Sequence, residues 1–174
     1  NVAVGVNAAT ALATGDDNIA IGYGALDAAD GAESNNIAIG SNALGNANLD
    51  TIEKNISIGV GSLDGVGTLA SANNIAIGYD AMGGTWTGTT SVKNIAIGNS
   101  AMDAAMNAAN DNVGIGNKAL TLTTGDSNIA IGSDALENAV ANSQNIAIGV
   151  SALKSINNAE SDNIAIGTEA MQGA

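Results

Sequence analysis

A five-residue motif, Asn-Ile-Ala-Ile-Gly, recurs along the whole chain. It stands unchanged at residues 18–22, 36–40, 74–78, 94–98, 128–132, 145–149 and 163–167, and near-copies begin at residues 1, 55 and 112. A fixed core with a remainder of variable length is typical of repeat proteins, in which each unit adds one coil to a stack. We therefore predict one repeat domain over residues 1–174, interpreted as part of a longer chain. Its units start at residues 1, 18, 36, 55, 74, 94, 112, 128, 145 and 163.

Alternation inside the motif predicts a β-strand. The first and third residues after Asn are Ile or Val, and the residue between them is Ala, Ser or Gly, which matches the two-residue period of a strand. The Gly that closes each motif predicts a corner with positive φ or a close approach of backbones. Stacking the units gives an all-β fold, a parallel β-solenoid (β-roll) of ten 16–20-residue coils. At about 4.8 Å per rung it would be roughly 45 Å long.

A second fixed element, a small residue followed by Leu or Met, comes after two intervening residues in every unit except the first, which has Ala-Ala. We predict that this Leu or Met packs across from the Ile pair of the strand. Ala-rich connectors at 101–110 and 135–142 predict short helical turns. The predicted structural core comprises Ile19, Ile21, Leu26, Ile37, Ile39, Leu44, Ile75, Ile77, Met82, Ile95, Ile97, Met102, Ile129, Ile131, Leu136, Ile146, Ile148 and Leu153.

The Asn that starts each strand is predicted to stack on its copies in the coils above and below. Side-chain amides in such a stack can hydrogen-bond along the fibre direction. A structural role is thus favoured over a binding role for these side chains. The predicted ladder comprises Asn18, Asn36, Asn55, Asn74, Asn94, Asn112, Asn128, Asn145 and Asn163.

A thin core predicts that one chain recruits others. Each coil offers about three large apolar residues, worth roughly 1.5–3 kcal/mol each when buried, whereas ordering the backbone costs about 1–2 kcal/mol per residue. Thin scaffolds commonly gain stability by oligomerisation. The small residues of the strands would let another backbone approach closely; the alternative is that they face water. The predicted oligomer face comprises Ala20, Ala38, Ser57, Ala76, Ala96, Ala130, Ala147 and Ala165.

Composition excludes several classes of function. The chain has no Cys, His, Arg, Pro or Phe, and its 17 acidic residues against four Lys give a net charge of −13. Without Cys or His, the usual zinc ligand sets and the Ser-His and Cys-His nucleophile pairs are impossible. Too few cations are present for nucleic acid or an anionic membrane surface to be a partner. No apolar run approaches membrane-spanning length. We therefore expect no enzyme activity, no cofactor, no metal and no membrane insertion.

Four weaker alternatives stay open. Carboxylate pairs for glycoside cleavage could be Asp16 with Asp17 or Glu160 with Asp162, although turn-forming roles are commoner for such connector residues. Calcium could bind an acidic loop, although the Gly-Gly-x-Gly-x-Asp repeat of calcium-binding β-rolls is absent. Ice binding would need Thr in one repeated position, and the Thr clusters at 85–90 and 121–124 do not recur at one position of the repeat. Trp86 could stack on a carbohydrate, but we favour its covering the core of its own coil.

The repeat unit resembles the Ala-Ile-Gly-x-x-Ala-Leu repeats of phage tail fibres and related virion fibres, and is similar to the head repeats of trimeric autotransporter adhesins. The likeness covers essentially all 174 residues in ten registered copies. It implies a left-handed parallel β-roll, three chains about a common axis and a role in attachment. Adhesin heads have shorter and more uniform repeats, which favours the fibre interpretation.

The resemblance implies a structural and adhesive segment of an extracellular or virion fibre that mediates or supports attachment to a host cell or surface. Its expected partners are copies of itself in a homotrimer, with a cell-surface glycan or protein as a candidate receptor. The alternative is a bacterial trimeric adhesin head. A polysaccharide-degrading tailspike-like enzyme and an ice-binding solenoid are less favoured.

Overall fold

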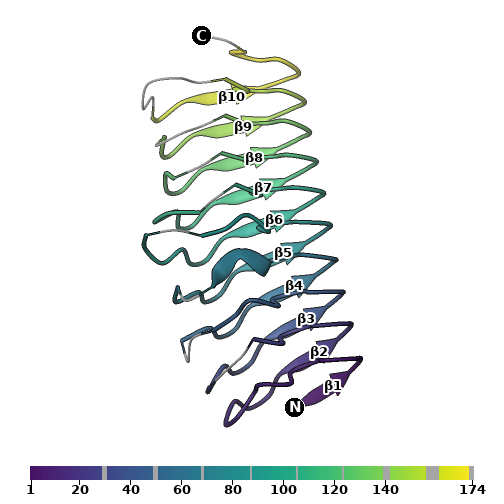
Figure 1. The fold of residues 1–174 in the computed structure, drawn as a ribbon. Helices are drawn as coiled ribbons and strands as arrows, with labels where there is room; N and C mark the ends of the chain where they lie inside the picture. The colour runs from purple at the N-terminus through teal and green to yellow at the C-terminus, as the bar shows by residue number, and fades with distance from the viewer. Residues whose placement is uncertain are drawn as a thin grey trace.

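The computed structural model is an all-β parallel solenoid, as the repeat predicts (Figure 1). It describes residues 1–28, 31–48, 51–67, 69–86, 88–104, 106–122, 124–138, 142–155 and 161–172. Each motif forms one three-residue strand, and we call the coil that contains βn coil n. The strands are β1 Val2–Val4, β2 Ile19–Ile21, β3 Ile37–Ile39, β4 Ile56–Ile58, β5 Ile75–Ile77, β6 Ile95–Ile97, β7 Val113–Ile115, β8 Ile129–Ile131, β9 Ile146–Ile148 and β10 Ile164–Ile166.

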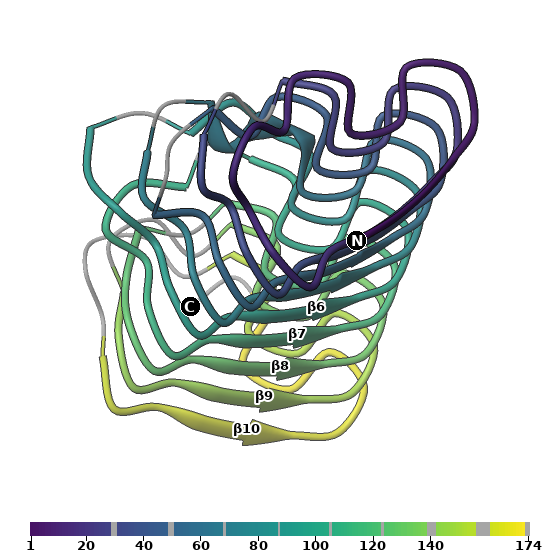
Figure 2. The same cartoon turned by 90° about the horizontal axis from the view of Figure 1, so that it is seen from below.

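The described strands form one ten-stranded parallel sheet whose spatial order is the order of the sequence. Every strand pairs with the next in strict register, so that Ile37 lies beside Ile56 and Ala38 beside Ser57. Viewed along the stack, each coil carries its strand on one side, and on the far side the connector folds inward towards it (Figure 2). The two termini lie at opposite ends of the stack (Figure 1).

The small middle residue of each strand points into the coil, which reverses our prediction for the two faces. Ala20, Ala38 and Ala96 are fully buried within a single chain, so they cannot form an oligomer face. The same correction applies to Ser57, Ala76, Ala130 and Ala147, which are fully buried, and to Ala165, which is 3% exposed.

The Ile pairs accordingly point outward and were wrongly assigned to the interior. Ile21, Ile97 and Ile131 are each 37–38% exposed, and the remaining predicted Ile residues, which are Ile19, Ile37, Ile39, Ile75, Ile77, Ile95, Ile129, Ile146 and Ile148, are half-buried or exposed. The predicted Leu and Met members of the core are confirmed: Leu26, Leu44, Met82, Met102, Leu136 and Leu153 are all fully buried.

Lack of space explains the reversal. At Gly114, the middle residue of β7, an added Cβ would lie 3.1 Å from Met102 Cγ and 3.5 Å from Leu120 Cβ. The Ala-Leu segment of the connector is therefore packed directly on the strand, and little more than a methyl group fits between them. Coil 4 shows the same contact in polar form, because Ser57 Oγ lies 2.6 Å from Ser62 Oγ and donates to the Ser62 carbonyl at 2.7 Å.

Two conformational features let the connector return so tightly. The motif Gly residues have φ between 128° and 141°, a region essentially open to Gly alone. The Leu or Met of coils 2 to 10, which is buried in coils 2 to 9, has a left-handed backbone with φ between 48° and 56°. Such a residue costs about 1–2 kcal/mol, and hydrogen bonds between coils hold it in place: Leu44 N–H donates to the Ser62 carbonyl at 2.9 Å.

The described parts of the connectors contain turns and one short 3-10 helix, η1 Asp64–Val66, and no α-helix. The helical turns predicted for 101–110 and 135–142 are therefore wrong over the residues described there. The connectors of coils 3 to 6 instead add interior side chains, since Ile52, Val66, Trp86 and Met106 are all buried. Trp86 is 5% exposed and covers the core of its own coil, as we favoured.

Enlarging the inward residue should destabilise the fold, whereas reshaping the outward residue beside it should not. We expect Ala96→Leu to lower the free energy of unfolding by about 1–3 kcal/mol through overpacking. Ile97→Leu, on the outward side of the same strand, should change it by less than about 0.5 kcal/mol. Urea unfolding followed by circular dichroism measures both; equal effects would contradict the inward direction of Ala96.

The corner glycines should be irreplaceable. A Cβ on Gly59, where φ is 137°, would overlap the carbonyl oxygen of Gly78, so Gly59→Ala should cost at least about 3 kcal/mol. Gly67 provides the control, because its φ is 52° and no atom lies within 4 Å of an added Cβ. Gly67→Ala should cost about 1–3 kcal/mol, because only its backbone conformation, with φ 52° and ψ −125°, is strained. Comparable shifts of the two urea midpoints would show that backbone overlap at the corner is unimportant.

Candidate functional site

The starting asparagines form a continuous ladder through the stack. The Oδ1 of Asn74 accepts from the backbone N–H of Asn94 at 2.9 Å and from its Nδ2 at 3.2 Å. The Nδ2 of Asn94 also donates to the carbonyl of Ala109, near the end of the same coil, at 2.8 Å. Each ladder amide from Asn18 to Asn128 bonds a carbonyl of its own coil in this way, so it closes that coil and joins it to the coils on both sides. The same inter-coil pair of bonds links Asn1, Asn18, Asn36, Asn55, Asn74, Asn94, Asn112, Asn128, Asn145 and Asn163 in order.

A ladder so bonded has no spare capacity for a ligand. Asn94 is fully buried, and its amide donors and its oxygen are all engaged within the chain. The asparagines are thus structural residues, which leaves the outward sheet face and the connectors as the places where function can lie.

Replacing one ladder amide by a carboxyl should make stability depend on pH. In Asn94→Asp the carboxylate cannot donate to Ala109 or Asn74, and at pH 7 we expect a loss of about 3–5 kcal/mol. Burial raises the pKa of the new carboxyl above its unfolded value of about 3.9. Stability relative to the natural chain should therefore be partly restored as the pH falls through the raised pKa of the folded protein towards the unfolded value, because the protonated acid regains one donor.

Urea unfolding at pH 3.5 and at pH 7 measures this effect as a difference from the natural chain at the same pH. Asn73→Asp is the matched control, since Asn73 is exposed and immediately precedes the ladder residue Asn74. It should change the unfolding free energy by less than about 0.5 kcal/mol at either pH. A loss for Asn94→Asp that does not vary with pH would contradict the ladder chemistry.

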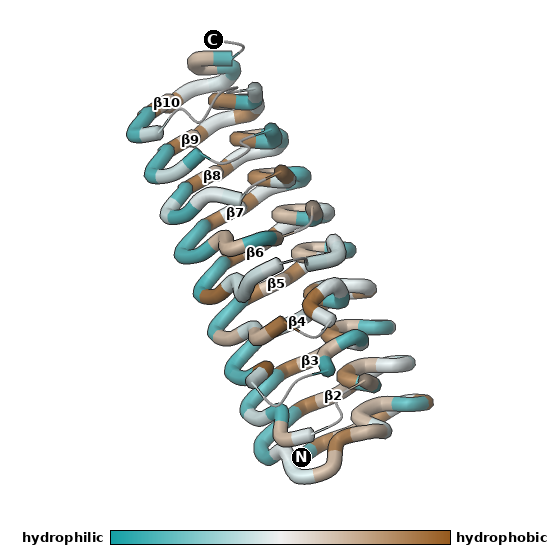
Figure 3. The backbone as a smooth tube through the Cα atoms, turned by 60° about the vertical axis from the view of Figure 1, so that its left-hand side comes forward, coloured by the Kyte–Doolittle hydropathy of each residue, from teal (hydrophilic) through white to brown (hydrophobic). Residues whose placement is uncertain are grey.

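The outward sheet face is a ladder of paired Ile side chains along β2 to β10, interrupted only by Val113. The apolar segments recur along the strands in Figure 3. Exposure rises where a neighbouring coil is lacking: Ile164 and Ile166 of β10 are 65% and 68% exposed, compared with 37% for Ile21. Neighbouring coils thus cover the sides of each Ile and leave its tip bare, which produces a narrow apolar strip.

The two borders of this strip differ. On the side of the Gly corner, the next residue of the coil is Val6, Tyr23, Val60, Tyr79 or Val150 in half of the coils, each 50–67% exposed. Tyr23 and Tyr79 therefore lie in one outward-facing column. On the other side, the residue before each ladder Asn is polar and exposed: Asp17, Asn35, Lys54, Asn73, Lys93, Asp111, Ser127, Gln144 and Asp162.

Acidic side chains gather on the connectors rather than on the sheet. Burial raises the pKa of Asp64, an effect that the backbone amides of Asn46 and Gly45 oppose and the charge of Asp80 reinforces. Burial likewise raises the pKa of Asp103, which the Ser100 hydroxyl partly offsets. A hydrogen bond to Asp80 raises the pKa of Tyr79. The charge of Asp80 thus contributes to the raised pKa of Asp64, Tyr79 and Asp103 alike.

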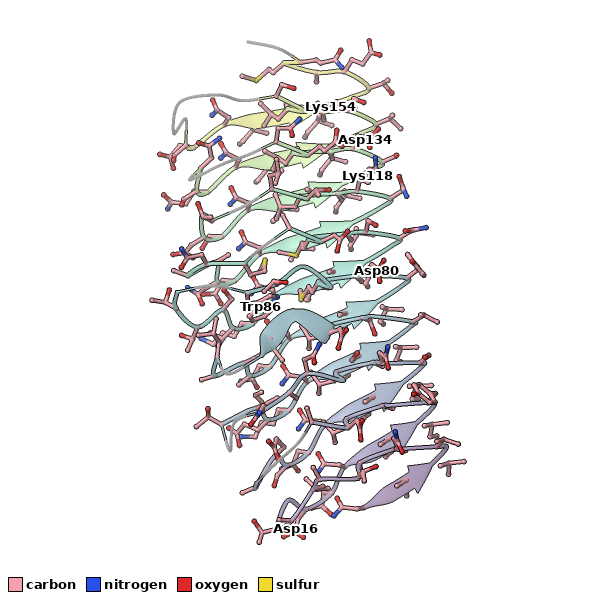
Figure 4. All side chains as sticks on the ribbon, in the orientation of Figure 1. Asp16, Asp80, Trp86, Lys118, Asp134 and Lys154 are labelled. Carbon is pink, nitrogen blue, oxygen red and sulfur yellow. The ribbon has the colours of Figure 1, made fainter. Side chains whose placement is uncertain are left out.

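The described carboxylates considered for glycoside cleavage are all exposed. Asp16 and Asp17 are exposed at the N-terminal end of the stack, where Figure 4 labels Asp16. Asp162 is exposed as well, and Glu160 lies outside the described residues. Over the described ranges, no group of three or more Asp or Glu side chains is placed to hold a metal ion. Nor does any helix in them have the length and apolarity to cross a membrane.

Comparison with known proteins adds no assignment. No protein-family model matches the chain. No curated protein and no solved structure matches it either.

Proposed function

We propose that this chain is a structural and adhesive segment of an extracellular or virion fibre, in which copies of the chain associate through the outward Ile strip and support attachment to a surface. The observation that carries the proposal is the strip itself, an unbroken apolar ladder on a rigid parallel sheet. Exposed contiguous apolar surface of this kind marks an interaction site in soluble proteins. Identical ladders of side chains also pack into dry interfaces between sheets.

The dimensions of the strip favour three copies over two. Ten strands at about 4.8 Å and three residues at about 3.3 Å give a face of roughly 450 Å² per chain. Two such faces bury about 900 Å², slightly below the roughly 1,000 Å² that a stable interface needs. Three chains about one axis bring the bordering columns into the contact as well, including Val60 and Tyr79. The proposed assembly is therefore a homotrimer.

A charge on the strip should dissociate the assembly. Sedimentation equilibrium of the natural chain at micromolar concentration should give about three times the chain mass of 16.8 kDa. Ile77→Lys combined with Ile58→Lys should give the single-chain mass, because two desolvated charges per chain would oppose association.

Thr90→Lys is the control, because Thr90 is exposed on the connector of coil 5, away from the strands. It should leave the mass unchanged, and circular dichroism should verify that all three proteins are folded. A natural chain that sediments as a monomer would refute the proposed association.

A further inference from the structure

Two hollows lie side by side on the connectors of coils 2 to 5. The first has a volume of about 270 Å³ and is lined by Ala28, Asn46, Asn48, Asp64, Gly65, Gly67 and Thr85. The second, of about 170 Å³, is lined by Gly24, Asp27, Asn42, Gly45, Asn46 and Asp64. Because Asn46 and Asp64 line both, the hollows form one groove, which spans about 14 Å along the stack at about 4.8 Å per coil. No strand residue lines it, so it is separate from the Ile strip.

The groove exists because glycines replace side chains in this half of the stack. A Cβ on Gly24 would lie 2.6 Å from Asn42 Oδ1, and one on Gly45 would lie 3.0 Å from Asp64 Oδ1. In coils 8 and 9 the repeat position of Gly45 carries the long side chains Glu137 and Lys154, and that of Gly24 carries Asp134 in coil 8. There Lys154 Nζ lies 3.1 Å from Glu137 and 3.5 Å from Asp134, and Figure 4 labels Lys154 and Asp134 near the C-terminal end. The open groove described here lies in the N-terminal half.

Asp64 is held in position at the centre of the groove. Its Oδ1 accepts from the backbone N–H of Asn46 at 3.1 Å and from Asn46 Nδ2 at 3.0 Å. The carboxylate of Asp64 is also stabilised by the backbone amide of Gly45. Over the described residues, the carboxylate of Asp27 and the side-chain amide of Asn42 have no hydrogen-bond partner within the chain. Both acceptors and amide donors therefore face the groove, at positions fixed by the stacked backbone.

The lining selects the chemistry of a ligand. Two carboxylates repel anions, yet the described residues offer too few of them together to enclose a metal ion. Carboxylates, amides and glycine backbone dominate the second hollow, which does not suit an apolar ligand. Hydroxyl groups satisfy such a surface, since each can donate to a carboxylate and accept from an amide.

We infer that this groove binds a neutral oligosaccharide, with the hydroxyls of one sugar unit bonded to Asp64 and Asn42. Each hollow is smaller than the roughly 300 Å³ at which drug-sized pockets begin, which suits one ring apiece and a ligand of at least two linked rings. The inference deepens the attachment role proposed above and rests on it for its biological meaning. Binding and self-association are nevertheless measured separately, so either can fail alone.

Saturation-transfer NMR and calorimetry with maltotriose, cellotriose and chitotriose test the assignment on the full chain. At least one of the three should bind saturably below about 10 mM. Asp64→Asn preserves the acceptor for Asn46 but removes the charge, and should weaken that binding about tenfold. Asn42→Ala should weaken it about fivefold. The carboxylated trisaccharide 3′-sialyllactose should bind more weakly than its neutral counterparts.

Asp103→Asn is the matched control, because Asp103 occupies the position of Asp64 two coils along and lines neither hollow. It should leave binding unchanged, and the urea midpoints of all variants should verify folding. Failure of all three neutral trisaccharides to bind would overturn the assignment, as would binding that survives Asp64→Asn and Asn42→Ala together. If the trisaccharides fail while the chain still sediments as a trimer, only the groove is refuted.

Discussion

The fold depends on the hydrogen bonds of one buried asparagine per coil. Each ladder amide from Asn18 to Asn128 closes its own coil through a carbonyl near its end and bonds to the asparagine of the next coil. A buried amide without these partners would cost several kcal/mol, so every rung requires the next to be in register. The rise and registration of the stack follow from this requirement. Connectors of different length are tolerated because the asparagine marks where each coil must return.

The corner glycine makes each coil of the registered stack very narrow. Positive φ at the corner and a left-handed Leu or Met bring the connector back onto the strand at close contact. Little more than a methyl group then fits inside each strand, and the β-branched residues on either side of it face outward. The apolar strip is thus a consequence of how tightly the coil closes, and a wider coil would have buried it.

Much of this arrangement could be predicted from the sequence, because strands, corners and ladder repeat with the motif. The direction of the strand faces could not, since alternation of large and small residues does not say which set is inside. The larger apolar side chain is usually the buried one, which suggested that Ile lies inside the coil. The coil is too narrow for Ile, so the small residue lies inside instead. One signal was present in coil 4. It has Ser at positions 57 and 62, whereas coils 2, 3 and 5 to 10 have Ala or Gly at the first of these repeat positions and Ala at the second. These two exceptions contact each other through Ser57 Oγ, which marks the middle of the strand as the inward side. The groove could not be predicted, because it depends on which coils place Gly24 and Gly45 beside one another.

The Ile strip and the connector groove differ in how regularly the backbone spaces their side chains. On the sheet, a side chain is neighboured at about 4.8 Å by the same position of the next coil, so a ladder of like residues builds a uniform strip suited to identical partners. On the connectors, coil lengths vary, and glycine or a charged residue can occupy the same position in different coils, as Gly45 and Glu137 do. Local hollows with individual chemistry arise only there. A solenoid built this way can assemble through one side and recognise a ligand through the other, since the asparagine ladder holds both to the same frame.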